Sequence, residues 1–128
     1  MKIEKLAITS PDVANAIVPV IVSGAPNAVS TTAACGVTNY NTTFATSSGE
    51  IVPTLADSTV TGQLRRFQFI TDGGHNVVLT PATAYQGGGT IITFADVGDV
   101  AELMWNGAAW QILALYNCAD GATAPVAS

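Results

Sequence analysis

Apolar and polar residues follow a strand-like pattern most clearly near the end of the chain, between residues 96 and 117. Apolar-rich runs of strand length flank Asn106-Gly107, a dipeptide that tolerates the positive φ angles of a two-residue type I′ turn. The pattern therefore predicts a β-hairpin. In the register that such a turn sets, these side chains share one face: Ala101, Leu103, Trp105, Ala108, Trp110 and Ile112.

Two tryptophans make this face the best candidate for the centre of the core. Aromatic side chains bury roughly 150 to 250 Å² each, so the pair removes more apolar area from water than any other local cluster. The opposite face of the predicted hairpin is mixed and includes Glu102. We therefore expect four side chains to anchor the fold: Leu103, Trp105, Trp110 and Ile112.

Alternation marks further strands earlier in the chain. Residues 64–71 place Phe67 and Phe69 on the face opposite Gln68, and an Asp-Gly-Gly turn follows. Residues 76–80 then have the composition of a returning strand. This spacing predicts a second hairpin.

Strand-length segments recur about every 8 to 12 residues in the second half of the chain, and no long stretch has helical spacing. The pattern predicts an all-β fold, either an antiparallel β-sandwich or a small, jelly-roll-like barrel. Residues 23–117 form a single β domain in this interpretation, with several short strands in the weakly patterned 23–58 segment. Residues 118–128 are a tail rich in Ala, Gly, Thr and Pro.

Residues 1–22 are interpreted as an N-terminal arm. Residues 1–10 carry apolar and cationic side chains without a helical stripe, which favours an extended segment. The Ser-Pro-Asp sequence that starts at residue 10 predicts a short helical turn, because it combines an N-cap, a proline at the first helical position and an acid in the first turn. Residues 17–22, interrupted by Pro19, suit an edge strand.

Charge argues against nucleic acid as a partner, and the length of the apolar runs argues against a membrane span. Only 10% of the 128 residues are charged, the net charge is -5, and four cations cannot form the basic stripe that nucleic-acid binding requires. The longest apolar run, residues 17–22, is far shorter than the roughly 20 residues of a membrane span. A surface this poor in charge suits a subunit covered by neighbours, or a secreted β protein.

Residue types that carry enzymatic or metal chemistry are sparse. The single histidine, His75, lies in a glycine-rich turn, and no Gly-x-Ser-x-Gly motif is present. Two distant cysteines and one histidine do not complete a zinc site, and Asp96 and Asp99 are interpreted as turn residues rather than calcium ligands. We predict no catalytic residue, no metal and no cofactor. Arg65 and Arg66 should point to opposite faces of their strand and pair with acids or with a neighbouring subunit.

Cys35 and Cys118 leave two interpretations open. A disulfide between them would close a long loop and stabilise the fold by roughly 4 kcal/mol, but it needs an oxidising compartment. Alternatively, they are two small buried apolar side chains.

Five segments of the C-terminal half carry a resemblance to a known class of protein: Thr59–Ile70, Val77–Pro81, Gly88–Phe94, Gly98-Asp99 and Leu103–Trp110. In their order of strands and turns they resemble small β modules in virion proteins of tailed bacteriophages, which include capsid decoration (cement) proteins, head fibres and tail fibres. The short chain and apolar arm resemble a decoration protein, a family whose members commonly sit as trimers on the capsid and lock capsomers together.

The resemblance implies a structural, non-enzymatic protein on the outer capsid surface of the virion. It would bind the major capsid protein as a homotrimer and stabilise the lattice, with no nucleic-acid or membrane partner. The arm is the natural contact, through Lys2, Ile3, Lys5, Leu6 and Ile8. The alternative is a receptor- or carbohydrate-binding module of a phage fibre or spike, in which Tyr40, Tyr85 or Tyr116 would stack on sugar rings.

Overall fold

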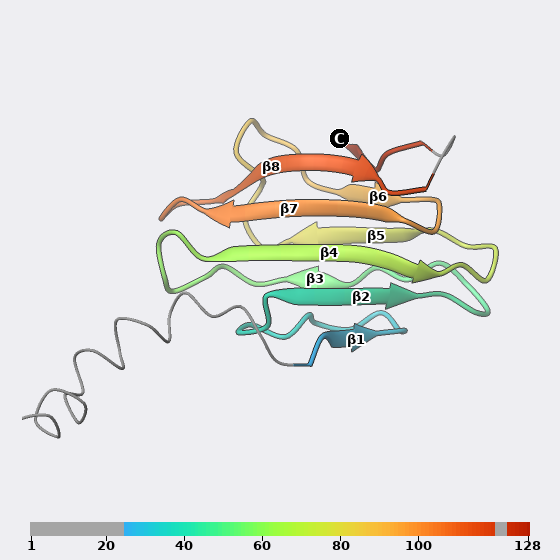
Figure 1. The fold of residues 1–128 in the computed structure, drawn as a ribbon. Helices are drawn as coiled ribbons and strands as arrows, with labels where there is room; N and C mark the ends of the chain where they lie inside the picture. The colour runs from blue at the N-terminus through green and yellow to red at the C-terminus, as the bar shows by residue number, and fades with distance from the viewer. Residues whose placement is uncertain (1–24, 120–122) are drawn as a thin grey trace, which may run out of the picture.

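The computed structural model describes residues 25–119 and 123–128, and within these ranges it contains strands and turns but no helix. Two β-sheets pack face to face with their strands in similar directions (Figure 1). This confirms the all-β, sandwich-like fold, and the sheets do not close into a barrel. The strands are β1 (Asn27–Val29), β2 (Asn41–Ala45), β3 (Thr54–Leu55), β4 (Leu64–Thr71), β5 (Val77–Pro81), β6 (Ile92–Phe94), β7 (Asp99–Trp105), β8 (Trp110–Asn117) and β9 (Val126–Ala127).

The expectation of a purely antiparallel sandwich is wrong, because both sheets are mixed. The first sheet has the order β1-β2-β4-β7-β8 and the second β3-β5-β6-β9. The pairs β1–β2, β2–β4 and β3–β5 are parallel, whereas the remaining pairs are antiparallel. Strands β2 to β5 alternate between the two sheets. A chain that reverses twice before it returns to a sheet runs parallel to the strand it left.

The predicted hairpin of residues 64–71 and 76–80 is wrong for the same reason. β4 belongs to one sheet and β5 to the other, so the turn between them is an arch over the core. Asp72 Oδ1 accepts hydrogen bonds from the backbone N–H groups of Gly74, at 2.7 Å, and His75, at 3.1 Å. A Cβ atom at Gly73 would lie 2.6 Å from the carbonyl oxygen of Thr46, so only glycine fits this close approach.

The β7–β8 hairpin forms, but with a four-residue loop instead of the predicted two-residue turn. Trp105 lies opposite Trp110, and Ala108 is exposed in the loop. Asn106 Oδ1 accepts hydrogen bonds from two later backbone N–H groups of the loop, at 2.9 Å each. Among the described residues only glycines have positive φ, and Gly107, at 99°, supplies it here. The side chain of Asn106 thus stabilises a four-residue loop in place of the two-residue turn that the Asn-Gly dipeptide predicts.

The four expected anchors lie on the inner face of this hairpin. Leu103, Trp105 and Trp110 are buried, and Ile112 is half-buried and packs against the core. The indole rings of Trp105 and Trp110 meet edge to face, 5.4 Å apart between centroids. Trp110 Nε1 donates a hydrogen bond of 3.0 Å to the carbonyl oxygen of Ala56, which satisfies the one polar group of its buried ring.

A β-bulge changes the register farther along the hairpin. Leu103 lies opposite Ile112, but Ala101 lies opposite Leu115, so β8 carries one extra residue. Because side chains alternate along a strand, the extra residue reverses the inside and outside positions beyond it. Leu115 therefore packs against the core, while Leu113 is 47% exposed.

Aromatic side chains from both sheets meet at the centre of the sandwich. The rings of Phe44 and Phe67 stack with centroids 5.9 Å apart, and Phe44 meets Phe94 of the second sheet edge-on at 5.3 Å. Burying such rings supplies the main apolar contribution to stability. Within the predicted 118–128 tail, β9 pairs antiparallel with β6 at the edge of the second sheet.

The predicted arm of residues 1–22, with its helical turn and edge strand, lies outside the described residues. Across residues 25–119 and 123–128, no helix has the length and apolar character needed to cross a membrane.

Candidate functional site

The outer side of the central strand pair presents charged and apolar side chains in matched positions, and Figure 1 looks onto this side. In the antiparallel pairing of β4 with β7, Leu64 lies opposite Met104 and Arg66 lies opposite Glu102. Leu64 is exposed, and the other three are half-buried. We call Leu64, Arg66, Gln68, Glu102 and Met104 the β4–β7 outer face.

The two charged side chains of this face, Arg66 and Glu102, bind different neighbouring strands. Arg66 donates hydrogen bonds from Nη2 to Gln68 Oε1, at 3.1 Å, and from Nε to Asn41 Oδ1 of β2, at 3.5 Å. Glu102 Oε1 accepts a hydrogen bond of 3.0 Å from the hydroxyl of Tyr116 on β8. Both charges are therefore held by neutral groups, and neither has an ion-pair partner among the described residues.

Tyr116 is the exposed aromatic side chain beside this face, 37% accessible to solvent. Desolvation, and next the hydrogen bond to Glu102, raise the pKa of the Tyr116 hydroxyl. Of the three tyrosines considered for stacking on sugars, Tyr85 is buried and donates a hydrogen bond from its hydroxyl to the carbonyl oxygen of Leu79 at 3.3 Å. Tyr40 is half-buried. Tyr85 is thus a packing residue, and Tyr116 is the accessible tyrosine of the three.

Arg65 lies on the inner face of β4 and is only 2% exposed. Its Nη2 donates to Thr42 Oγ1 at 3.1 Å, its guanidinium lies 5.1 Å from the centroid of the Phe67 ring, and its Nε has no hydrogen-bond partner. Burial lowers the pKa of Arg65, because desolvation disfavours the charged form. The expected pairing of the arginines with acids is wrong for this residue, which a hydroxyl and an aromatic ring surround instead.

Cys35 is buried near Arg65 and Tyr85 between the sheets. Burial raises the pKa of its thiol to about 11, against the opposing influence of the Arg65 guanidinium. Burial, and next the nearby Cys35, also raise the pKa of Tyr85. The thiol is therefore neutral and inert at ordinary pH, since the thiolate is the reactive form.

The alternative of a disulfide between Cys35 and Cys118 is wrong, because both thiols are free. Cys35 is the small buried apolar side chain of the second interpretation, whereas Cys118 is exposed. The sulfur of Cys118 donates a hydrogen bond of 3.2 Å to the carbonyl oxygen of Gly98.

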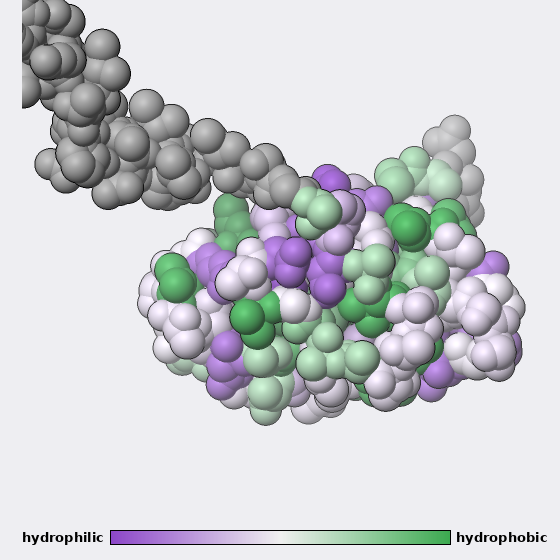
Figure 2. All heavy atoms as spheres, turned by 90° about the horizontal axis from the view of Figure 1, so that it is seen from below, coloured by the Kyte–Doolittle hydropathy of each residue, from purple (hydrophilic) through white to green (hydrophobic). Residues whose placement is uncertain are grey.

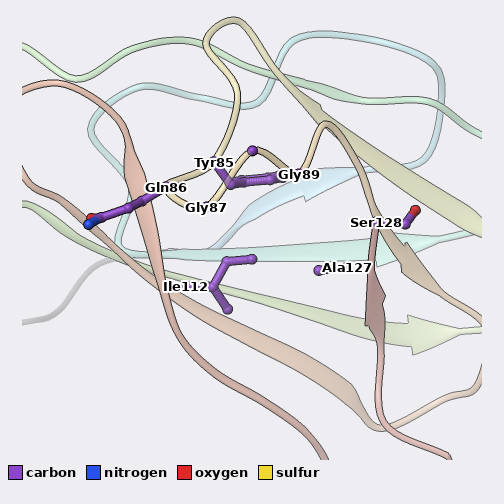
Figure 3. Close-up of a pocket in the computed structure, with 8 residues that line it drawn as sticks. Tyr85, Gln86, Gly87, Gly89, Ile112, Ala127 and Ser128 are labelled. Carbon is purple, nitrogen blue, oxygen red and sulfur yellow. The ribbon is translucent and has the colours of Figure 1, made fainter.

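A surface pocket of about 450 Å³ lies between the 85–89 turn, β8 and β9 (Figure 3). Ile112 and Tyr85 contribute its apolar wall, and the three glycines of the turn contribute backbone. Gln86 extends from the pocket toward the β7–β8 loop, where its Oε1 accepts a hydrogen bond from Asn106 Nδ2 at 2.5 Å. The lining has no acid or basic side chain. Such a pocket suits a neutral or apolar group and supplies no acid–base chemistry.

Of Asp96 and Asp99, the two predicted turn residues, Asp99 makes the turn contacts through its side chain. It is fully buried, and its Oδ2 accepts hydrogen bonds from the backbone N–H groups of Ala95, at 2.9 Å, and Asp96, at 3.1 Å. Its Oδ1 accepts a hydrogen bond of 2.7 Å from Asn117 Nδ2. All of these contacts tie the β6–β7 turn to the end of β8. Among the described residues, no three or more His, Cys, Asp or Glu side chains lie close enough together to hold a metal ion, and His75 is part of no such group.

The surface seen from the β1 side is mostly of intermediate hydropathy, with small apolar and polar patches scattered over it (Figure 2). Aliphatic side chains are exposed at both ends of the sandwich, with Val37, Val60 and Leu64 at one end and Ile70 and Val97 at the other. The five arm residues expected to contact the capsid lie outside the described residues.

Sequence reasoning missed two features of this site. The position of Arg66 opposite Glu102 in the sheet register depends on which strands are neighbours. No local sequence pattern encodes that. The burial of Arg65 had a signal, because Arg65 shares the parity of Phe67 and Phe69 along β4.

Comparisons with protein-family models, with curated proteins and with solved structures each found no match.

Proposed function

We propose that this chain is a structural virion protein, a capsid decoration (cement) protein that binds the outer capsid surface as a homotrimer and stabilises the lattice. Its partners are the major capsid protein and further copies of itself. In this proposal the protein performs no catalysis and needs no cofactor.

The weakly polar surface of a rigid β-sandwich is the observation that carries the proposal. Charged residues are 10% of the chain, and the visible surface is mostly of intermediate hydropathy (Figure 2). Covering charged groups costs desolvation energy, and the centres of protein interfaces are depleted of charge for that reason. A surface of Thr, Ser, Ala and Gly with scattered aliphatic side chains can be covered at low cost. The resemblance of the sequence pattern of strands and turns to phage virion modules suggests the setting.

Copy number in purified virions tests this role directly. Quantitative peptide mass spectrometry would compare the chain with the major capsid protein in particles from the genome that encodes it. A decoration protein should be present in copies that scale with the number of capsomers. A few copies per particle would indicate a fibre, and absence from the particle would overturn the proposal.

The arm is the proposed capsid contact. Deleting residues 1–10 should leave a folded oligomer that no longer binds capsids in a sedimentation assay. Leu6→Asp and Ile8→Asp should weaken binding in the full chain, whereas Thr9→Asp is the matched control for added negative charge. Unchanged capsid binding by the deletion variant would remove the arm from the proposal.

The receptor- or carbohydrate-binding module remains the second candidate, and the Tyr116–Glu102 contact favours it. An exposed aromatic ring beside a carboxylate provides stacking and hydrogen bonding, the two contacts that sugar rings use. Glycan-array binding that Tyr116→Ala abolishes and that Tyr40→Ala retains would support this function.

A further inference from the structure

The β4–β7 outer face has an order of side chains that is complementary to itself. Along the two antiparallel strands, an apolar pair, Leu64 and Met104, is followed by an opposite-charge pair, Arg66 and Glu102. All four side chains lie on the outer side of the sheet. Each pair therefore places one member on β4 and its complement on β7 at the same height.

A two-fold axis that runs along the strands, midway between β4 and β7, uses this order. The rotation carries β4 of one copy over β7 of the other, at the same height along the strands. Arg66 of each copy then lies over Glu102 of its partner, and Leu64 lies over Met104. We propose that the β4–β7 outer face pairs with the same face of a second copy of this chain.

The free charges favour a second copy over other occupants. Arg66 turns toward Asn41 and Gln68, and Glu102 turns toward Tyr116, so each charge keeps only neutral partners within the described chain. A second copy supplies a cation for Glu102 and an anion for Arg66 at once. A partner with one sign of charge would satisfy one residue and repel the other.

The size of the face predicts weak association. Strands β2, β4, β7 and β8 contain 28 residues, of which about half, roughly 14, point outward. A standard interface uses about 20 to 30 residues per partner. Pairing should therefore be concentration-dependent, with a Kd on the order of micromolar or weaker. This pairing is independent of the capsid role. Any three-fold contact would use another surface, so pairing doubles the mass of the unit, monomer or trimer, that is present at low concentration.

Charge reversal provides a test with an internal rescue. Sedimentation equilibrium over increasing concentration should show the mass of the wild-type chain doubling. Arg66→Glu and Glu102→Arg should each abolish the doubling, because like charges then face each other twice. An equimolar mixture of the two variants should restore it, since one copy then carries acids at both positions and the other carries bases at both. The double variant Arg66→Glu/Glu102→Arg should also restore it.

Glu50→Arg is the matched control, because Glu50 is exposed outside this face and its reversal should leave the doubling unchanged. Circular dichroism melting would verify that each variant is folded. Two results would overturn the proposal: a wild-type mass that stays constant up to about 1 mM protein, or a mixture that behaves as the sum of its components. Glycan binding that both single variants abolish, with a constant mass, would assign the face to a sugar instead.

Discussion

Arg65 and Arg66 are neighbours on β4, yet the two faces of the strand give them opposite surroundings. Arg65 is 2% exposed between the sheets, against Thr42 and the Phe67 ring. Arg66 lies on the outer side of the same sheet, held by Asn41 and Gln68. On the inner face, the contacts of the Arg65 guanidinium lie within the chain. They are incomplete, because the Arg65 Nε has no hydrogen-bond partner. On the outer face, neutral side chains hold both charges.

The difference shows where stability and recognition reside in a chain with four cations. A buried guanidinium without a carboxylate carries a desolvation cost that the apolar core must offset. An exposed one costs little and contributes little to folding. Substitutions on the inner face should therefore change stability, and substitutions on the outer face should change association.

The largest effect should come from the aromatic anchor of the inner face. Trp110→Ala removes a 1% exposed indole and its hydrogen bond to Ala56, and should lower the free energy of unfolding by about 3 to 5 kcal/mol. Leu113→Ala, on the exposed bulge of the same strand, should change it by less than about 0.5 kcal/mol. Urea denaturation measures both. If both substitutions lowered the free energy of unfolding equally, Trp110 would not be packed more tightly than Leu113, and the prediction would be wrong.

Replacing the buried cation should have the next largest effect. Arg65→Met keeps most of the side-chain volume and removes the unpaired charge, so we expect stabilisation of about 1 to 4 kcal/mol. Arg66→Met, on the outer side, should stay within about 0.5 kcal/mol of the wild type. Thr42→Val removes the one hydroxyl acceptor of Arg65 and should destabilise by about 1 to 3 kcal/mol. A loss of stability in Arg65→Met would show that Arg65 makes a net favourable contribution.

Stability should fall as the pH rises from about 9 to about 11. The pKa of Cys35 is raised from 9.0 to about 11 by burial, so the unfolded state loses this proton first. Between these values the unfolded state binds fewer protons than the folded state, which favours unfolding by up to about 3 kcal/mol. The raised pKa of Tyr85 acts in the same direction at higher pH. Cys35→Ala should reduce the fall in melting temperature between pH 9 and pH 11.

The smallest perturbation is thiol labelling of the wild type, which compares an inner with an outer side chain. The exposed Cys118 should react at once with a maleimide, whereas the buried Cys35 should react only after unfolding. Intact-mass spectrometry at successive times should show one adduct in the native state and two in denaturant. Two rapid adducts would place Cys35 at the surface.

The β7–β8 hairpin was predictable in its faces but not in its register. Loops of two and of four residues both place Trp105 and Trp110 on the same side, because each keeps the parity of the alternation. The loop length depends on Asn106, whose side chain binds two loop N–H groups. The bulge at Leu113 follows from packing that no local pattern describes.

Strand direction and burial of charge were less accessible to sequence reasoning. The span 64–71 was located correctly as a strand, but the following turn could equally close a hairpin or arch to another sheet. The result depends on whether Phe67 and Phe69 face Val77 across the core, a non-local property. Alternation did place Arg65 on the phenylalanine side, but the rule that charges lie outside conflicts with it.

The bulge of β8 also bears on edge-to-edge association of the sheet. β8 is an eight-residue edge strand, from Trp110 to Asn117, without a charge or a proline. Such an edge is a template for edge-to-edge stacking into fibrils. The extra residue at Leu113 bends the strand and interrupts the even spacing of its ladder. We expect the bulge at Leu113 to oppose such stacking, as lysine or proline does at the edges of other sheets.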